Sequence, residues 1–281
     1  MTYSNTAAVA DRHTGAADHT GADRIECAIR KANATGRPAI VAFLTAGYPT
    51  SDEFEVALDV VAAEADVVEI GVPFSDPMAD GITIQRSSRQ ALEAGVTLSR
   101  ILESVSRATF STPIVLMGYL NPFLAFGIDA LVREARASGI DGVIVPDLPY
   151  EECRPFLDVF DAACLAMIQL VSPVTPPERL QTLCDASRGF VYAVTKTGTT
   201  GGDSVSAENT VSYLEGVRAA SGLPVLAGFG IRSAKQVREL APYADGVIVG
   251  SALLEIIAED KDPAKFLRGL REKTDDRVVG A

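Results

Sequence analysis

The chain has 281 residues, 47% of them hydrophobic, and a formal net charge of -12. This length suits one large core, and the acidic balance without a basic stretch argues against nucleic acid and anionic membranes as partners. The sequence also lacks an apolar run long enough to cross a bilayer.

The first 24 residues contain few large apolar side chains and are expected to form a flexible tail, so residues 25–281 are predicted to be one catalytic domain. Both histidines, His13 and His19, fall in this tail. The expected folded body therefore excludes a Ser-His-Asp triad and a histidine metal site. The four cysteines match no zinc or disulfide pattern, which indicates a reducing, cytoplasmic setting.

Eight β-rich segments follow, at residues 39–47, 66–71, 113–119, 141–147, 165–172, 189–194, 224–230 and 245–250. Between them, the apolar spacing of residues 54–61 and 128–135 is typical of helices, and Thr50 and Ser233 are expected N-caps. Strands that alternate with helices predict a parallel sheet, and eight such units predict an α/β fold, a (β/α)8 TIM barrel. The alternative is an open doubly wound sheet, but no GxGxxG fingerprint follows the first strand.

The second strand and its loop, VVEIGVPFSDPMADG at residues 67–81, carry Glu69 and Asp80. Side chains alternate along a strand, so if Val68 and Ile70 face the outer helices, Glu69 faces the barrel interior near the active-site end. A buried salt bridge is the alternative, but no other predicted strand interior holds a lysine or arginine. An unpaired carboxylate there is a catalytic candidate with a raised pKa. Asp80 alone is a weaker candidate, because loop aspartates are often turn or cap residues.

The last three predicted strands end in glycine-bearing loops: KTGTTGGDS from residue 196, GFGIRS from residue 228 and GSALLEII from residue 250. In such barrels phosphate binds in the loops after strands seven and eight, at a helix N-terminus. Gly201, Gly230 and Gly250 let backbone N–H groups approach an anion, and Ser251 opens the expected last helix. Each glycine alone is more often a turn residue, but together they predict a phosphate site. TGTTGGDS is either a mobile lid or a merely exposed segment.

The chain resembles the tryptophan synthase alpha chain family from about residue 26 to residue 257. The matching segments are FLTAGYP, VEIGVPFSDPMADGITIQ, PIVLMGYLNP, GVIVPDLPYEE, YAVTKTGTTG, LAGFGI and GVIVGSALLEII. The resemblance implies the same barrel and a lyase of tryptophan biosynthesis. The implied reaction is retro-aldol cleavage of indole-3-glycerol phosphate to indole and glyceraldehyde 3-phosphate, without a metal or organic cofactor.

The resemblance also implies roles for single residues. Glu69 matches a catalytic glutamate that could shuttle protons, and Asp80 matches a second carboxylate that could accept the indole N–H and stabilise its positive charge. The implied substrate-binding residues are a pocket tyrosine, two phenylalanines of the indole pocket, a lid threonine and the phosphate site: Tyr192, Phe43, Phe229, Thr200, Gly201, Gly230, Gly250 and Ser251.

Two segments depart from the family pattern. Thr195 and Thr199 replace a serine and a valine after the sixth predicted strand, and Val174 replaces a threonine after the fifth. Both departures lie in or beside the expected lid, so they bear on its closure more than on the chemistry.

The family works with a beta chain, which implies an α2β2 assembly in which indole passes through a tunnel. The positions that match its contact surface are Pro73, Asp76, Asn121 and Pro149.

Three other interpretations stay open at this point. A stand-alone indole-3-glycerol phosphate lyase would share every catalytic residue and release free indole. Another phosphate-sugar isomerase or synthase would need a lysine or cysteine acid–base set on the strands, which the sequence lacks. A non-catalytic phosphate-binding barrel would have no use for Glu69 and Asp80, and an assay of substrate turnover would distinguish it.

Overall fold

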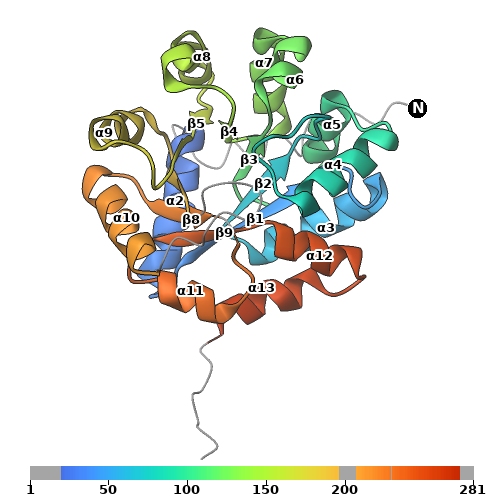
Figure 1. The fold of residues 1–281 in the computed structure, drawn as a ribbon. Coiled ribbons are helices and arrows are strands. Elements are labelled where there is room, and N and C mark those ends of the chain that lie inside the picture. Colours follow the sequence, from blue (N-terminus) through green and yellow to red (C-terminus); the bar gives the residue numbers. More distant parts are fainter. Residues whose placement is uncertain (1–19, 196–206, 229, 273–281) are drawn as a thin grey trace, which may run out of the picture.

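The computed structural model describes residues 20–195, 207–228 and 230–272, which form a ring of strands surrounded by helices (Figure 1). The strands are β1 Ala39–Thr45, β2 Val67–Gly71, β3 Ile114–Met117, β4 Gly142–Ile144, β5 Ala166–Met167, β6 Gln169–Val171, β7 Val191–Val194, β8 Val225–Gly228 and β9 Gly246–Val249. The helices are α2 Gly21–Ala34, α3 Ser51–Glu64, α4 Ile82–Glu93, α5 Leu98–Arg107, α6 Leu120–Phe126, α7 Ile128–Ser138, α8 Tyr150–Ala162, α9 Pro177–Ala186, α10 Ala207–Ala220, α11 Ala234–Leu240, α12 Ser251–Ala258 and α13 Pro263–Arg271.

All strand pairs are parallel, in the order β5-β4-β3-β2-β1-β9-β8-β7-β6. The two ends of this order, β5 and β6, are separated in the chain by Ile168 alone, so the sheet is a near-closed barrel. This confirms the predicted TIM barrel and corrects its strand count, because the expected fifth strand forms two pieces. At the break the N–H of Gln169 donates to the Ser187 hydroxyl at 3.0 Å, and that hydroxyl donates to the carbonyl of Phe190. A side chain thus takes the place of one bond of the strand ladder.

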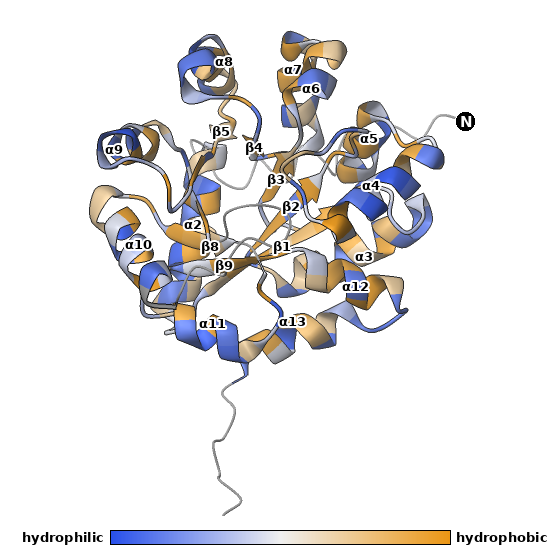
Figure 2. Cartoon of the chain, in the orientation of Figure 1, coloured by the Kyte–Doolittle hydropathy of each residue, from blue (hydrophilic) through white to orange (hydrophobic). Residues whose placement is uncertain are grey.

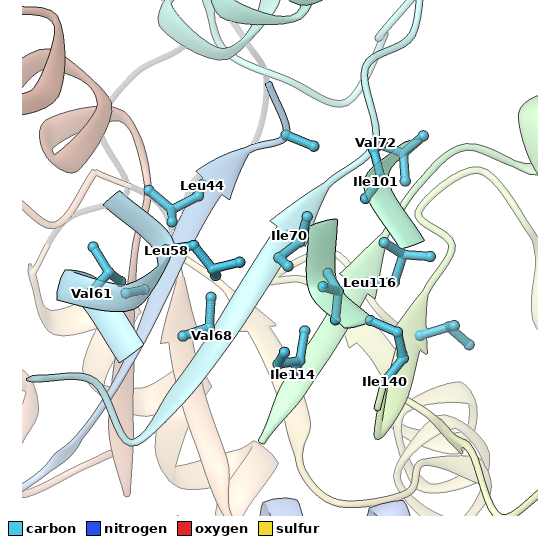
Figure 3. Packing of buried hydrophobic residues seen from close by; sticks show 14 of the residues in the cluster. Leu44, Leu58, Val61, Val68, Ile70, Val72, Ile101, Ile114, Leu116 and Ile140 are labelled. Carbon is cyan, nitrogen blue, oxygen red and sulfur yellow. The ribbon is translucent and has the colours of Figure 1, made fainter. Parts of the chain in front are cut away.

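The strand side chains alternate between two apolar layers. Outward-facing residues of β1 to β4 pack against the helices, and Figure 3 shows Val68 of β2 among them near Leu58 of α3. Inward-facing residues, including Val67 and Val115, form a second cluster inside the ring. The hydropathy colours agree, since the strands are apolar and the helices present their polar sides outward (Figure 2).

Helix α2 closes the N-terminal end of the barrel. Its Ile25 and Ile29 are fully buried and belong to the inner cluster. At its start Gly21 approaches the strand ends so closely that a Cβ would lie 1.9 Å from the carbonyl oxygen of Asp141, so no larger residue fits. Thr20 caps the helix in a reciprocal pair with Asp23. Helical structure thus begins upstream of the expected boundary after residue 24, while residues 1–19 lie outside the described residues.

The expected helix signals are confirmed where the structure describes them. The spacings at 54–61 and 128–135 fall in α3 and α7, and the hydroxyls of Thr50 and Ser233 accept from the third backbone N–H of α3 and α11. No helix in the described parts of the chain is both long and apolar enough to cross a membrane.

Candidate active site

A cavity of about 340 Å³ opens at the C-terminal ends of the strands. It brings together most of the predicted site residues, from the first, second, sixth, seventh and eighth predicted strands and their loops: Phe43, Glu69, Asp80, Tyr192, Gly230, Gly250 and Ser251. The other three, Thr200, Gly201 and Phe229, lie outside the described residues.

Glu69 lies inside the barrel, as its position in β2 predicts. It pairs in register with Phe43 of β1 and Val115 of β3, so its side chain shares their inward layer. The residue is 1% exposed, and its Oε2 atom has no hydrogen-bond partner within residues 20–195, 207–228 and 230–272. The alternative of a buried salt bridge therefore finds no support in this part of the chain.

Asp80 lies at the end of the loop after β2, just before the N-cap of α4. The hydroxyl of Tyr119 donates to its Oδ2 at 3.0 Å and accepts from the N–H of Ala79 at 2.9 Å. The Tyr119 ring also stacks on Phe74, with centroids 5.1 Å apart. Tyr119, which follows β3, therefore contacts the loop after β2 at three points. Nothing in the sequence singles out Tyr119 as the partner of Asp80, because the two residues are 39 positions apart.

The carboxyl groups of Glu69 and Asp80 differ in pKa. Loss of hydration raises the pKa of Glu69 to about 8, with a smaller contribution from the charge of Asp80. Loss of hydration also raises the pKa of Asp80, but the hydrogen bond from Tyr119 opposes it and the value is about 6. At neutral pH the site then holds a protonated Glu69 beside an ionised Asp80, that is, one proton donor and one anion.

Two aromatic side chains form walls of the cavity, and two strand glycines make room for them. A Cβ at Gly71 would lie 2.4 Å from the ring of Phe43, and a Cβ at Gly228 would lie 2.4 Å from the ring of Tyr192. Burial and the nearby carboxylates raise the pKa of Tyr192 well above its usual value, so its hydroxyl stays neutral. Met117 and Leu170 also contribute to the apolar lining, and the sequence could not identify them because nothing distinguishes them from core residues.

Another part of the cavity wall suits an anion. Gly230 adopts a φ of 80°, a left-handed conformation that favours glycine. Gly250 is the N-cap of α12 and Ser251 is its first residue, so free N–H groups and the helix dipole lie at the cavity wall. No group of three or more His, Cys, Asp or Glu that could hold a metal ion occurs among the described residues.

Two of the three departures from the family pattern can be located. The Thr195 hydroxyl donates to the carbonyl of Gly228 at 2.9 Å, which ties the end of β7 to β8. Val174 lies after β6 and is 76% exposed. Thr199 lies outside the described residues.

The expected partner contacts do not all lie on the surface. Asp76, Asn121 and Pro149 are exposed in the segments after β2, β3 and β4. Pro73 is buried, so it cannot itself touch a partner in this conformation.

Comparisons with known proteins agree with this geometry. The family model of the tryptophan synthase alpha chain matches residues 29–276. A tryptophan synthase alpha chain of Xylella fastidiosa (strain M12) is 44% identical over 266 residues, covering 90% of this chain and 98% of the relative. One of Xanthomonas axonopodis pv. citri (strain 306) is 43% identical, covering 90% of this chain and 94% of the relative. Among solved structures, Mycobacterium tuberculosis tryptophan synthase is similar with a TM-score of 0.81 and 36% identity, covering 91% of this chain and 100% of that one.

Proposed function

The chain belongs to the tryptophan synthase alpha chain family, a lyase of tryptophan biosynthesis, and from that premise we propose that Glu69 and Asp80 carry out its chemistry. The observation that carries the proposal is the pair of buried carboxyl groups in one cavity, with a pKa of about 8 for Glu69 and about 6 for Asp80. Groups whose acidities are pushed apart in this way can act as acid and as anion at the same pH.

In the proposed mechanism the protonated Glu69 gives its proton to C3 of the indole ring of indole-3-glycerol phosphate. The positive charge that develops on the indole nitrogen is stabilised by Asp80, whose carboxylate accepts the N–H. Glu69, now a carboxylate, takes the proton of the hydroxyl on the adjacent side-chain carbon. The bond from that carbon to C3 then breaks. Its electron pair restores the aromatic ring, and the hydroxyl carbon becomes the aldehyde of glyceraldehyde 3-phosphate.

The remaining predicted residues bind the substrate in this proposal. Phe43 and Tyr192 contact the indole ring, and Gly230, Gly250 and Ser251 offer backbone N–H groups to the phosphate. Phe229, Thr200 and Gly201 are proposed to add to the indole pocket, the lid and the phosphate site, as the family resemblance implies.

We further propose that a tryptophan synthase beta chain docks over the mouth of the barrel, in an α2β2 assembly, near Asp76, Asn121 and Pro149. Support comes from exposed apolar side chains on the segments after β2 and β3. Met78 is 74% exposed, Ile82 71% and Leu124 50%. Apolar groups exposed around a site entrance are typical of a surface that a partner covers.

The test measures indole release from indole-3-glycerol phosphate by the purified chain, with and without an added beta chain. Slow release alone and a large increase with the beta chain supports the full proposal. Turnover at ordinary enzyme rates of about 1–10³ s⁻¹ without any response to a beta chain would identify a stand-alone lyase. No turnover under either condition would leave a phosphate-binding barrel and refute the mechanism.

A further inference from the structure

The formal charges along the cavity wall are unequal. Glu69 and Asp80 contribute two carboxyl groups, and Arg232 is the one cationic side chain among the described residues that line the cavity. Arg232 follows the turn at Gly230 and precedes α11, so it stands on the same side as the proposed phosphate site. The chain has a net charge of -12, so this cation is the side chain in the described cavity wall that can attract a phosphate electrostatically.

Arg232 is held at this position by Glu255. Its guanidinium forms a two-nitrogen ion pair with the Glu255 carboxylate, which also accepts from the hydroxyl of Thr83 at 3.2 Å. Glu255 belongs to α12, the helix whose N-terminus faces the cavity. The Arg232 side chain is 55% exposed, so it is free to turn about its own bonds.

We propose that Arg232 binds the phosphate of the substrate, leaving Glu255 to do so. The inference rests on the proposed function, because that function supplies the phosphate. Arginine suits the exchange, since its planar guanidinium makes the same two-pronged contact with a phosphate as with a carboxylate. The dianionic phosphate is the stronger partner, and the backbone N–H groups of Gly250 and Ser251 then act together with a full positive charge. In this proposal Glu255 competes with the phosphate for the guanidinium of Arg232. While the site is empty, Glu255 neutralises Arg232 and holds it beside the cavity.

The two ends of the ion pair therefore have opposite effects on phosphate binding. Arg232→Gln removes the cation, and we expect it to weaken binding roughly tenfold, the size of one partly exposed charge-assisted hydrogen bond. Glu255→Gln removes the competitor and a negative charge, and we expect it to tighten binding by about threefold to fivefold. Lys235→Gln is the matched control, because it removes one positive charge from exposed α11 outside the cavity.

The experiment measures competitive inhibition of indole release by inorganic phosphate, together with KM and kcat for indole-3-glycerol phosphate. We expect the inhibition constant and KM to rise in Arg232→Gln and to fall in Glu255→Gln, with kcat close to that of the unmodified chain. The melting temperature of each variant identifies any that has lost its fold. The salt dependence of the inhibition constant should become shallower in Arg232→Gln alone.

A purely structural ion pair predicts a different result. Both substitutions would then loosen the contact between the α11 region and α12, and both would weaken phosphate binding. That outcome, or an Arg232→Gln variant that binds phosphate no more weakly than the Lys235→Gln control, would overturn the inference. The failure differs from that of the proposed function, in which the unmodified chain itself would release no indole.

Discussion

Acidic residues that are buried or partly buried have different surroundings at the two ends of this barrel. At the N-terminal end three aspartates each precede a strand and accept a hydrogen bond from a backbone N–H in the first two residues of a neighbouring strand: Asp66, Asp141 and Asp245. Each also meets an arginine, and Asp66 meets both Arg37 and Arg271. At the C-terminal end one oxygen of Glu69 has no hydrogen-bond partner among the described residues, and the Asp80 carboxylate accepts a hydrogen bond from the neutral hydroxyl of Tyr119.

This difference shows what each end does for the protein. A buried carboxylate that is paired and hydrogen-bonded keeps its charge and fixes the register of the strands around it. A buried carboxyl group that lacks such partners costs stability when ionised, and in return its proton becomes available near neutral pH. We therefore expect changes at the N-terminal end to alter stability and changes at the mouth to alter turnover.

The largest effect should come from Glu69→Gln, which keeps the shape of the side chain and removes its exchangeable proton. We expect kcat to fall by about 10²-fold or more, the size of a lost acid–base group. Steady-state indole release measures this, and circular dichroism checks the fold. Turnover similar to that of the unmodified chain would show that Glu69 is not the proton shuttle.

The same variant should lose activity but gain stability relative to the unmodified chain at high pH. The pKa of Glu69 is about 8 in the folded chain against an ordinary value of 4.5 in the unfolded chain, so folding retains the proton. The unmodified chain then loses stability as the pH rises from about 5 to about 8, because burial opposes ionisation. Glu69→Gln removes this loss, so its melting temperature should exceed that of the unmodified chain more at pH 8 than at pH 5.

At the other end of the barrel, Asp141→Asn breaks the ion pair with Arg24 while an oxygen remains for the N–H of Ile114. Asp141 is fully buried, so we expect the free energy of unfolding to fall by about 3 kcal/mol, with kcat of the folded enzyme unchanged. Urea denaturation measures the first quantity. Glu93→Gln, which breaks the exposed pair with Arg89, should change stability by less than about 1 kcal/mol and is the control.

Asp80→Asn should lower kcat by roughly 10- to 100-fold while KM changes little, because the charge on the indole nitrogen is absent from the bound substrate and develops only during the reaction. Initial rates over a range of substrate concentrations separate the two parameters. An increase in KM alone would make Asp80 a binding residue and would remove it from the proposed mechanism.

The pH profile tests both carboxyl groups together. Activity needs Asp80 ionised and Glu69 protonated, so kcat/KM should be highest between pH about 6 and about 8. It should fall about tenfold per pH unit outside this window. A profile that keeps rising above pH 8 would contradict a protonated Glu69 as the initial acid.

The smallest expected effect is that of Tyr119→Phe. The hydrogen bond from Tyr119 lowers the pKa of Asp80, so its loss should move the acid limb of the profile to higher pH and reduce kcat by a few-fold. Tyr213→Phe is a matched control, because it removes a hydroxyl that donates to the carbonyl of Val171, outside the cavity. If both variants gave the same profile, the hydroxyl of Tyr119 would have only a packing role.

The sequence predicts those features that follow from the alternation of side chains. The inward position of Glu69 follows from its apolar neighbours Val68 and Ile70, and the barrel follows from the repeated strands and helices. The break at Ile168 could not be predicted, because it depends on a bond from Gln169 to the hydroxyl of Ser187, 18 residues further along the chain.

The partners of Tyr119 and Arg232 could not be predicted from the sequence for a similar reason. Tyr119 could reach either of two carboxyl groups, and the sequence does not say which loop comes closer. Arg232 and Glu255 are 23 residues apart and meet only because α12 passes beside the loop after β8.

Helix α2 covers the N-terminal end of the barrel. With Ile25 and Ile29 packed beneath the inner side chains, the described cavity that holds Glu69 opens at the strand ends. Under the proposed function, substrate and products would enter and leave at this end of the barrel, so a product that is still bound there blocks the next substrate. A loop or another subunit that covers this end of the barrel would then control when substrate binds and when products leave, without contacting a reacting atom.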